Sequence, residues 1–285
     1  MALLNCDVFS DVLGLSTSLT VILPQATSTQ IGATGNVRDA DPPLLYLLHG
    51  LSDDHTIWLR RTSIERYVAP LGLAVVMPQV HRSFYTDEVY GNRYWTFLSE
   101  ELPELVHNFF RLSRRRDDTF VAGLSMGGYG AMKWGLRYPE RFAAVASLSG
   151  ALDISARQQD SAGQNNQRQN TPVQNTPVQD DPAPDDPAQD VQMMRRIFGD
   201  QPVSSTDDDL FALLDRLDPA AAPSMYVCCG TEDVLYPENK RFVQAAAGRD
   251  LRLVSDFGPG EHDWAYWDAT IQDVLGWLPL TPAGS

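Results

Sequence analysis

The segment GLSMG at residues 123–127 sets Ser125 between two glycines, with the apolar run TFVAG leading into it and the helix-like MGGYGAMKWGLRYP leading out. A serine hydroxyl attacks a carbonyl carbon only when a neighbouring base takes its proton and the side chain stands clear of the backbone. A sharp strand-to-helix turn exposes the side chain in this way, and it crowds the positions two residues before and after the serine, which favours glycine there. The pattern alone is common, but with both flanks it predicts that Ser125 is a nucleophile rather than a small residue in a glycine-rich loop.

A nucleophilic serine needs a base, and His262 is the one histidine of five that follows Ser125 in the chain. It lies in SDFGPGEHDWAYW, on a predicted loop between a late strand and the last helix, where such a base is expected. The alternative is a surface histidine that caps a helix. A carboxylate must hold the imidazole in one tautomer and stabilise its protonated form. The segment MYVCCGTEDVLYPEN offers Asp233 for this role, which the Gly-x-x-Asp spacing favours over its neighbour Glu232.

The negative oxygen formed during such an attack requires backbone N–H donors. The amide of Met126, at the start of the predicted helix, is one candidate. The second is expected in the loop after an earlier central strand, and the segment LLYLLHGLSDDHTIW supplies the amide of Leu51. We expect His49, beside the glycine of this loop, to brace the loop rather than to act as a base.

Short apolar runs bounded by Gly, Pro or Asp predict strands, and most are continuous, as expected for strands buried on both faces. The predicted strands are Leu3–Phe9, Ser18–Leu23, Leu44–Leu48, Ala74–Pro78, Thr119–Ala122, Ala143–Leu148, Ser224–Cys228 and Leu251–Ser255. The predicted helices are Ser63–Ala69, Thr96–Phe110, Gly127–Tyr138, Asp208–Leu217, Glu238–Ala247 and Trp264–Leu278. Their alternation predicts an α/β fold with a mostly parallel central sheet and helices on both faces, and the first two strands predict an antiparallel edge hairpin.

Residues 155–190 interrupt this alternation. They contain almost no apolar side chains, and the tandem repeat NTPVQNTPVQ is followed by DDPAPDDPAQD. Such a composition buries too little surface to offset chain entropy, which predicts a flexible surface insertion, with an ordered lid as the alternative. Because the strands and helices after it are needed to complete one sheet, we expect residues 1–285 to form a single domain.

The formal charge of −15 argues against a nucleic acid partner, since binding to phosphates needs a concentrated cationic surface, and it disfavours anionic membranes equally. The start MALLNCDVFSDVLG has neither the basic residues nor the long apolar segment of a signal peptide, and no window is apolar enough for a membrane span. The three cysteines favour buried free thiols. We therefore expect a soluble, cytoplasmic protein, and we predict no metal.

With these residues in place, the sequence resembles the esterase D branch of the α/β-hydrolases, and most closely its tributyrin-esterase-like members. The resemblance rests on the segments YLLHGLSDDHTIWLRRTSIERY, YWTFLSEELPELV, FVAGLSMGGYGAMKWGLRYPERFAAVASLSGALD, CGTEDVLYPEN and GEHDWAYWD. It implies an α/β-hydrolase fold and hydrolysis of short-acyl esters without a metal or organic cofactor. It also implies a triad of Ser125, Asp233 and His262, with Leu51 and Met126 as oxyanion donors.

The predicted function is therefore that of a serine carboxylesterase acting on small-molecule esters through an acyl-enzyme. The same branch contains acyltransferases and S-formylglutathione hydrolases, which use the same triad, and the latter typically carry a cysteine after the oxyanion loop where this chain reads HGLSDDHTIW. A non-catalytic binding protein on a hydrolase scaffold is the alternative of another class. Trp58 and Trp95 are weaker candidates for substrate contact, and the resemblance leaves self-association open.

Overall fold

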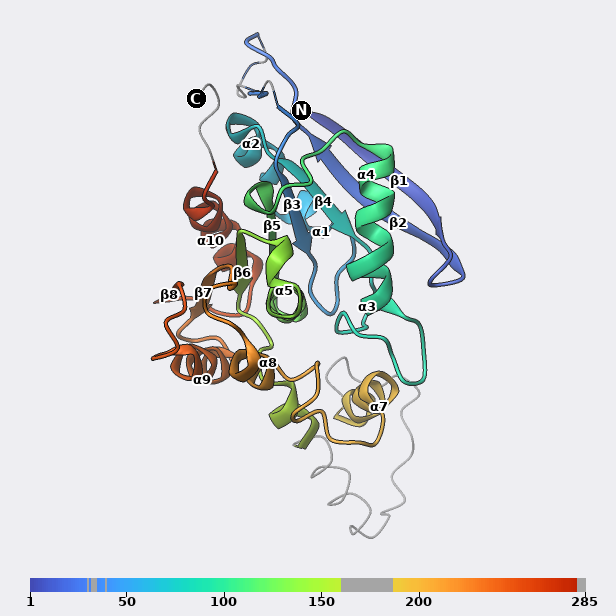
Figure 1. Ribbon diagram of the computed structural model, residues 1–285, viewed down its shortest axis with the longest axis vertical. Coiled ribbons are helices and arrows are strands. Elements are labelled where there is room, and N and C mark those ends of the chain that lie inside the picture. The colour runs from blue at the N-terminus through green and yellow to red at the C-terminus, as the bar shows by residue number, and fades with distance from the viewer. Residues whose placement is uncertain (30, 32–34, 39, 160–186, 281–285) are drawn as a thin grey trace, which may run out of the picture.

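The computed structural model describes residues 1–29, 31, 35–38, 40–159 and 187–280. One eight-stranded sheet with the strand order β1-β2-β4-β3-β5-β6-β7-β8 forms its centre (Figure 1). The strands are β1 (Ala2–Ser10), β2 (Leu15–Leu23), β3 (Leu44–Leu48), β4 (Ala74–Pro78), β5 (Thr119–Leu124), β6 (Ala144–Leu148), β7 (Ser224–Gly230) and β8 (Leu253–Gly258). β2 pairs antiparallel with β1 and β4, whereas the other pairs are parallel. The predicted α/β fold with an antiparallel edge hairpin is confirmed.

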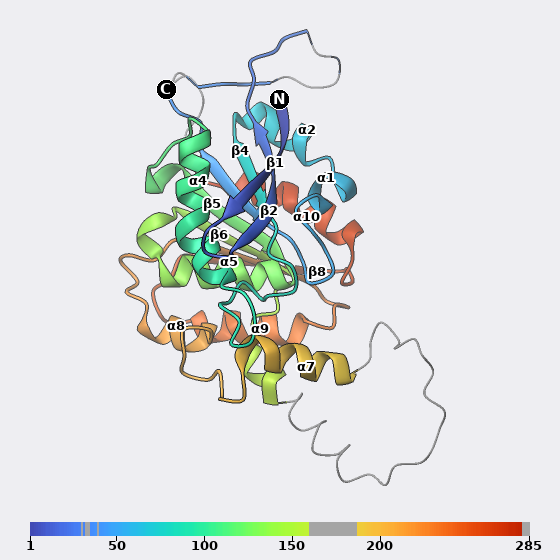
Figure 2. The same ribbon diagram turned by 90° about the vertical axis from the view of Figure 1, so that its right-hand side faces the viewer.

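Helices cover both faces of the sheet, and each face has its own apolar core. Along β3, Leu45 and Leu47 pack into one core, while Leu44, Tyr46 and Leu48 pack into the other. The first layer contains α1 (Ile57–Arg61), α2 (Ile64–Val68) and α10 (Trp264–Trp277), and the second contains α4 (Leu102–Phe109), α5 (Met126–Arg137), α8 (Leu210–Arg216) and α9 (Tyr236–Ala246) (Figure 2). Central strands with both faces covered need apolar residues at every position, which is why they are continuous runs in the sequence.

The limits of several elements differ from the prediction at glycines. β3 and β4 lie where they were predicted, but β5 and β7 each run two residues further, through Gly123 and Gly230. Glycine is a weak strand former, yet both residues continue the ladder, Gly123 opposite Ser147 and Gly230 opposite Gly258. The five-residue helix α1 was not predicted, because it is too short to display a helical period.

The predicted helix Thr96–Phe110 is not uniform. It consists of α3 (Tyr94–Thr96), the π-helical turn η2 (Phe97–Glu101) and α4, which contains Pro103 in its first turn. Proline has no N–H to donate to the carbonyl four residues earlier. That carbonyl, on Ser99, instead accepts a hydrogen bond from the guanidinium of Arg141. Short 3-10 turns complete the helices at η1 (Ala69–Leu71), η3 (Arg116–Asp118) and η4 (Pro139–Arg141).

Both described ends of the predicted flexible insertion are helical, which the sequence did not indicate. Residues 154–159 form a helical turn, and α7 (Pro187–Phe198) begins inside the predicted insertion. The buried side chains of Met194 and Ile197 anchor α7 to the core. The C-terminal end of α7 is also fixed to the loop after β4, because the amide of Val89 donates to the carbonyl of Ile197 at 2.9 Å. The rest of the predicted insertion, residues 160–186, lies outside the described residues.

Three further predictions concern the cysteines, a membrane span and the domain count. Cys228 and Cys229 are buried and Cys6 is half-buried, and all three thiols are free. Over the ranges that the structure describes, no helix has the length and apolar character required to cross a bilayer. The assignment of residues 1–285 to a single domain stays a prediction.

Candidate active site

Ser125 occupies the turn between β5 and α5 with φ 53° and ψ −117°. Residues other than glycine rarely adopt a positive φ. A Cβ at position 123 would lie 2.4 Å from the backbone of Gly127, and one at position 127 would lie 2.6 Å from the carbonyl oxygen of Leu48. Both glycines are therefore required by close backbone approach. Such a conformation costs on the order of 1–3 kcal/mol and persists only where the surrounding structure holds it.

The surrounding structure holds Ser125 through its own backbone. The Ser125 amide donates to the carbonyl of Leu148 at 2.9 Å, and the amide of Ala151 donates to the Ser125 carbonyl at 3.1 Å. These two bonds tie the turn to the end of β6 and to the segment after it. The turn is thus fixed from a neighbouring strand as well as by its two glycines.

The structure brings together the three residues of the predicted triad, with His262 between Ser125 and Asp233. The Nε2 of His262 is 3.1 Å from the Oγ of Ser125, and its Nδ1 is 2.8 Å from one oxygen of Asp233 and 3.0 Å from the other. Asp233 is 4% exposed, whereas the Ser125 and His262 side chains remain partly open to solvent. The three groups therefore form one hydrogen-bonded chain that leads from a buried carboxylate to an accessible hydroxyl.

The Asp233 carboxylate is stabilised in its charged form. Burial would raise the pKa of Asp233, but hydrogen bonds from His262 and from the amide of Leu235, at 2.7 Å, together hold that pKa below its usual value. The ionised Asp233 carboxylate accepts a hydrogen bond from His262, so the Nδ1 of the imidazole carries the proton. This tautomer leaves Nε2 as an acceptor directed at the Ser125 hydroxyl.

Glu232, the rival carboxylate in the sequence, has a different position. It is exposed, and its carboxylate accepts a hydrogen bond from the amide of Gly260 at 2.6 Å, which lowers its pKa. Its own amide donates to the carbonyl of Gly260 at 3.1 Å. Glu232 therefore fixes the loop that carries His262, while Asp233 contacts the imidazole itself. Gly230 permits this close approach, because a Cβ there would lie 2.0 Å from the Gly260 carbonyl oxygen.

The ring of Trp267 also fixes His262, in an edge-to-face contact with a centroid distance of 4.9 Å and an interplanar angle of 88°. Trp267 belongs to α10 and is 5% exposed. Neither Trp267 nor the loop contact of Glu232 was predicted, because both depend on how the last loop folds back onto β7 and no motif marks them.

The loop after β3 carries the predicted oxyanion donor Leu51, and His49 braces it as expected. The buried imidazole of His49 lies with Nδ1 at 2.7 Å from the carbonyl of Gly50, and its Nε2 accepts from the amide of Val80 at 3.2 Å. Because a trans peptide unit is planar, holding the Gly50 carbonyl also sets the direction of the Leu51 N–H, on the opposite side of that unit. The second predicted donor, Met126, is the first residue of α5, where the amide has no partner within the helix.

The buried His49 makes stability depend on pH. Burial lowers the pKa of His49 from 6.5 to about 4, so the unfolded chain binds this proton at a higher pH than the folded protein does. The contribution of His49 to the free energy of unfolding is therefore complete above about pH 6.5, and it decreases by up to about 3 kcal/mol as the pH falls towards about 4. Urea unfolding at several pH values should show that the free energy of unfolding falls less steeply with decreasing pH for His49→Gln than for the wild type. Glutamine keeps one donor and one acceptor but does not titrate. Equal slopes for both proteins would contradict this expectation.

The two tryptophans proposed as weaker substrate contacts have structural contacts. Trp58 is 1% exposed and its indole N–H donates to the carbonyl of Leu48 at 3.1 Å. Trp95 is 5% exposed, and the Nζ of Lys133 lies 4.4 Å from its ring centroid. Both rings therefore belong to the apolar cores, and their contact with a substrate stays a prediction.

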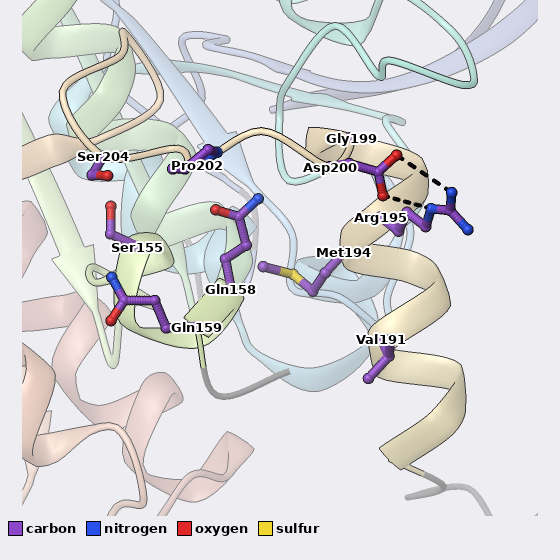
Figure 3. A pocket seen from close by; sticks show the side chains of 10 residues that line it. All are labelled: Ser155, Gln158, Gln159, Val191, Met194, Arg195, Gly199, Asp200, Pro202 and Ser204. Atoms are coloured by element: carbon purple, nitrogen blue, oxygen red, sulfur yellow. Dashed lines mark hydrogen bonds and ion pairs between the residues drawn. The ribbon is translucent and has the colours of Figure 1, made fainter. Parts of the chain in front are cut away.

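A hollow of about 400 Å³ lies between residues 154–159 and α7 (Figure 3). Its lining residues are Ser155, Gln158, Gln159, Val191, Met194, Arg195, Gly199, Asp200, Pro202 and Ser204. The side chain of Gln158 is hydrogen-bonded to the residues on either side of Pro202, since it donates to the carbonyl of Gln201 and accepts from the amide of Val203. The lining contains none of the three residues of the hydrogen-bonded chain, so this hollow is not the candidate active site.

The sheet, the strained turn after β5 and the Ser125–His262–Asp233 chain together define an α/β-hydrolase. The protein belongs to the Esterase family, whose model matches residues 13–278. It is 28% identical to the acetyl esterase of Caldicellulosiruptor saccharolyticus over 282 residues, which cover 98% of each chain.

Two solved structures from Staphylococcus aureus are similar over 98% of both chains at 32% identity. They are the fluorophosphonate-binding serine hydrolase FphF, with a TM-score of 0.77, and the S-formylglutathione hydrolase FrmB, with a TM-score of 0.75. Together with the family match, these relatives identify the chain as an esterase D-like serine hydrolase that acts on esters.

Proposed function

We propose that the protein is a carboxylesterase that hydrolyses short-chain acyl esters with Ser125 as nucleophile, His262 as base and Asp233 as the group that orients the base. The observation that carries this proposal is the position of His262, within 3.1 Å of the Ser125 hydroxyl and 2.8 Å of the Asp233 carboxylate. These are hydrogen-bond distances, and a base must lie within such reach of the proton that it removes.

In the proposed reaction, His262 Nε2 takes the proton of Ser125 as the oxygen attacks the ester carbonyl. The amides of Leu51 and Met126 stabilise the resulting oxyanion. Collapse of the tetrahedral intermediate breaks the bond to the alcohol, and the imidazolium of His262 returns its proton to that leaving oxygen. Water, deprotonated by His262, then attacks the acyl-enzyme and releases the acid, and the proton returns to Ser125.

The proposed preference for short acyl groups rests on the relative named acetyl esterase, which matches over nearly the whole chain. The likeness to FrmB, named an S-formylglutathione hydrolase, supports a thioester as the second candidate substrate. The loop after Leu51 reads SDDHTIW and carries no cysteine, which favours the oxygen ester.

An acyl-chain series tests this preference. We expect the kcat/KM for p-nitrophenyl esters to be highest for acetate or butyrate and to fall at least about 10-fold by the octanoate, because each misfitted methylene in an acyl site changes binding by about 1 kcal/mol or more. S-formylglutathione, assayed by loss of thioester absorbance, serves as the competing substrate. A higher kcat/KM for this thioester than for every p-nitrophenyl ester would support the thioesterase, and a maximum at octanoate would contradict the short-chain proposal.

A further inference from the structure

The loop that follows β4 is strained near its contacts with His49, in the loop after β3. His81, Phe84 and Tyr85 all have positive φ, between 49° and 50°, although none of them is glycine. Residues with this backbone conformation persist only where surrounding contacts hold them, and they are frequent at functional sites. The contacts of Tyr85 therefore indicate what this strain achieves.

Tyr85 connects this loop to the loop that carries Leu51. Its ring is fully buried and packs on α5, where a Cβ at Gly130 would lie 2.5 Å from the Tyr85 ring. Its hydroxyl donates to the carbonyl of His49 at 2.8 Å. The next carbonyl, that of Gly50, is held by the His49 imidazole. The carbonyl oxygens of two successive peptide units, 49–50 and 50–51, are therefore each hydrogen-bonded, and the second unit carries the Leu51 N–H.

Lys133 holds the backbone of Tyr85 in place from the other side. This lysine of α5 is fully buried, and its Nζ donates at 2.9 Å to the Tyr85 carbonyl and at 2.9 Å to the Oγ1 of Thr86. Its charge is paired with Asp208 at 2.5 Å. A buried ammonium group is expensive unless it is paired and hydrogen-bonded, and here its hydrogen bonds go to the strained loop and its ion pair to Asp208.

We propose that Tyr85 is a positioning residue for the oxyanion loop, held by the buried Lys133–Asp208 pair, and that its hydroxyl fixes the peptide units that aim the Leu51 amide. This inference rests on the proposed function, because it assumes that the Leu51 amide stabilises an oxyanion. A donor must lie within a few tenths of an ångström of its productive position to stabilise the transition state, and a loop with one unfixed peptide unit samples a wider range.

The variant Tyr85→Phe tests this role, because it keeps the ring against Gly130 and removes only the hydroxyl. We expect kcat for p-nitrophenyl acetate to fall about 10-fold with KM within about twofold of the wild type, since removing an oxyanion donor outright costs about 10²–10³ in kcat. Inhibition by a trifluoromethyl ketone, which forms a tetrahedral adduct with a serine, should weaken by a similar factor. Tyr226→Phe is the control, because it removes a partly buried tyrosine hydroxyl that donates to Asp256 at 3.0 Å, in strands β7 and β8. It should keep the kcat and the ketone affinity of the wild type.

Wild-type kcat and ketone affinity in a folded Tyr85→Phe protein would overturn the inference, as would equal losses in the Tyr226→Phe control. Thr86→Val supplies a second test, because it removes one oxygen contacted by Lys133 and retains the shape of the side chain. It should lower kcat about threefold at unchanged KM, and wild-type kcat would overturn the role of Lys133. If Ser125→Ala is as active as the wild type, the proposed function itself fails. If Ser125→Ala is inactive while Tyr85→Phe matches the wild type, this inference alone fails.

Discussion

Ser125→Ala is expected to fold like the wild type and to lose p-nitrophenyl acetate hydrolysis by a factor on the order of 10⁴ to 10⁶. Alanine has the same restriction on backbone conformation as serine, and the three backbone hydrogen bonds of residue 125, with Leu148, Tyr129 and Ala151, involve main-chain atoms that the substitution keeps. The variant therefore retains the turn and loses only the attacking oxygen. Initial rates measure the loss, and a circular dichroism spectrum with a thermal melt measures the fold.

A fluorophosphonate probe separates loss of the nucleophile from loss of the fold. The probe should label the wild type at the peptide containing Ser125 and should leave Ser125→Ala unlabelled. The control is Ser113→Ala, because the Ser113 hydroxyl is bonded to Asp118 near the opposite end of β5. This control should be labelled and active like the wild type. Labelling of a folded Ser125→Ala protein, or retained activity, would show that another residue is the nucleophile.

Asp233→Asn should lower kcat by about 10³ to 10⁴, because a neutral amide no longer stabilises the imidazolium and can favour the wrong tautomer of His262. Its neighbour supplies the matched control. Glu232→Gln also removes one negative charge, but Glu232 is exposed and contacts the Gly260 amide rather than the imidazole. We expect this control to lose less than about 10-fold, since a glutamine oxygen still accepts from that amide.

Steady-state rates for p-nitrophenyl acetate are measured for both variants across pH 5 to 9, so that a shift of the pH–rate profile is not mistaken for a loss of kcat. Near-equal losses in the two variants would contradict the separate positions of these carboxylates. A larger loss in Glu232→Gln than in Asp233→Asn would make Glu232 the orienting acid.

The sequence was sufficient to predict the sheet, and it named three residues that the structure brings into one hydrogen-bonded chain, whose catalytic roles stay a prediction. Buried parallel strands are continuous apolar runs, and the chain order Ser125, Asp233, His262 is the order that this fold brings to one edge of its sheet. The choice of Asp233 over Glu232 also followed from spacing. It agrees with the geometry because Asp233 turns inward after β7 while Glu232 faces the loop of Gly260.

The sequence was insufficient wherever a role depends on packing between distant segments. The Tyr85 hydroxyl reaches His49 across 36 positions, and no motif marks that contact. Trp58 and Trp95 are aromatic residues in segments that follow strands, which suits a pocket wall as well as a core, and the sequence did not reveal how deeply both rings are buried. The helix α7 was not predicted at all, because its few apolar residues, Val191, Met194 and Ile197 among them, directly follow a strongly polar stretch.

The close approach of Gly230 to Gly260 has a consequence for thermal motion in this site. Asp233 and His262 lie on joined segments, since the end of β7 and the His262 loop are connected by reciprocal bonds between Glu232 and Gly260. Ser125, the proposed nucleophile, lies between β5 and α5 instead. We therefore expect a relative movement of β5 and β7 to change mainly the 3.1 Å distance between His262 and Ser125, and to leave the contact between Asp233 and His262 in place.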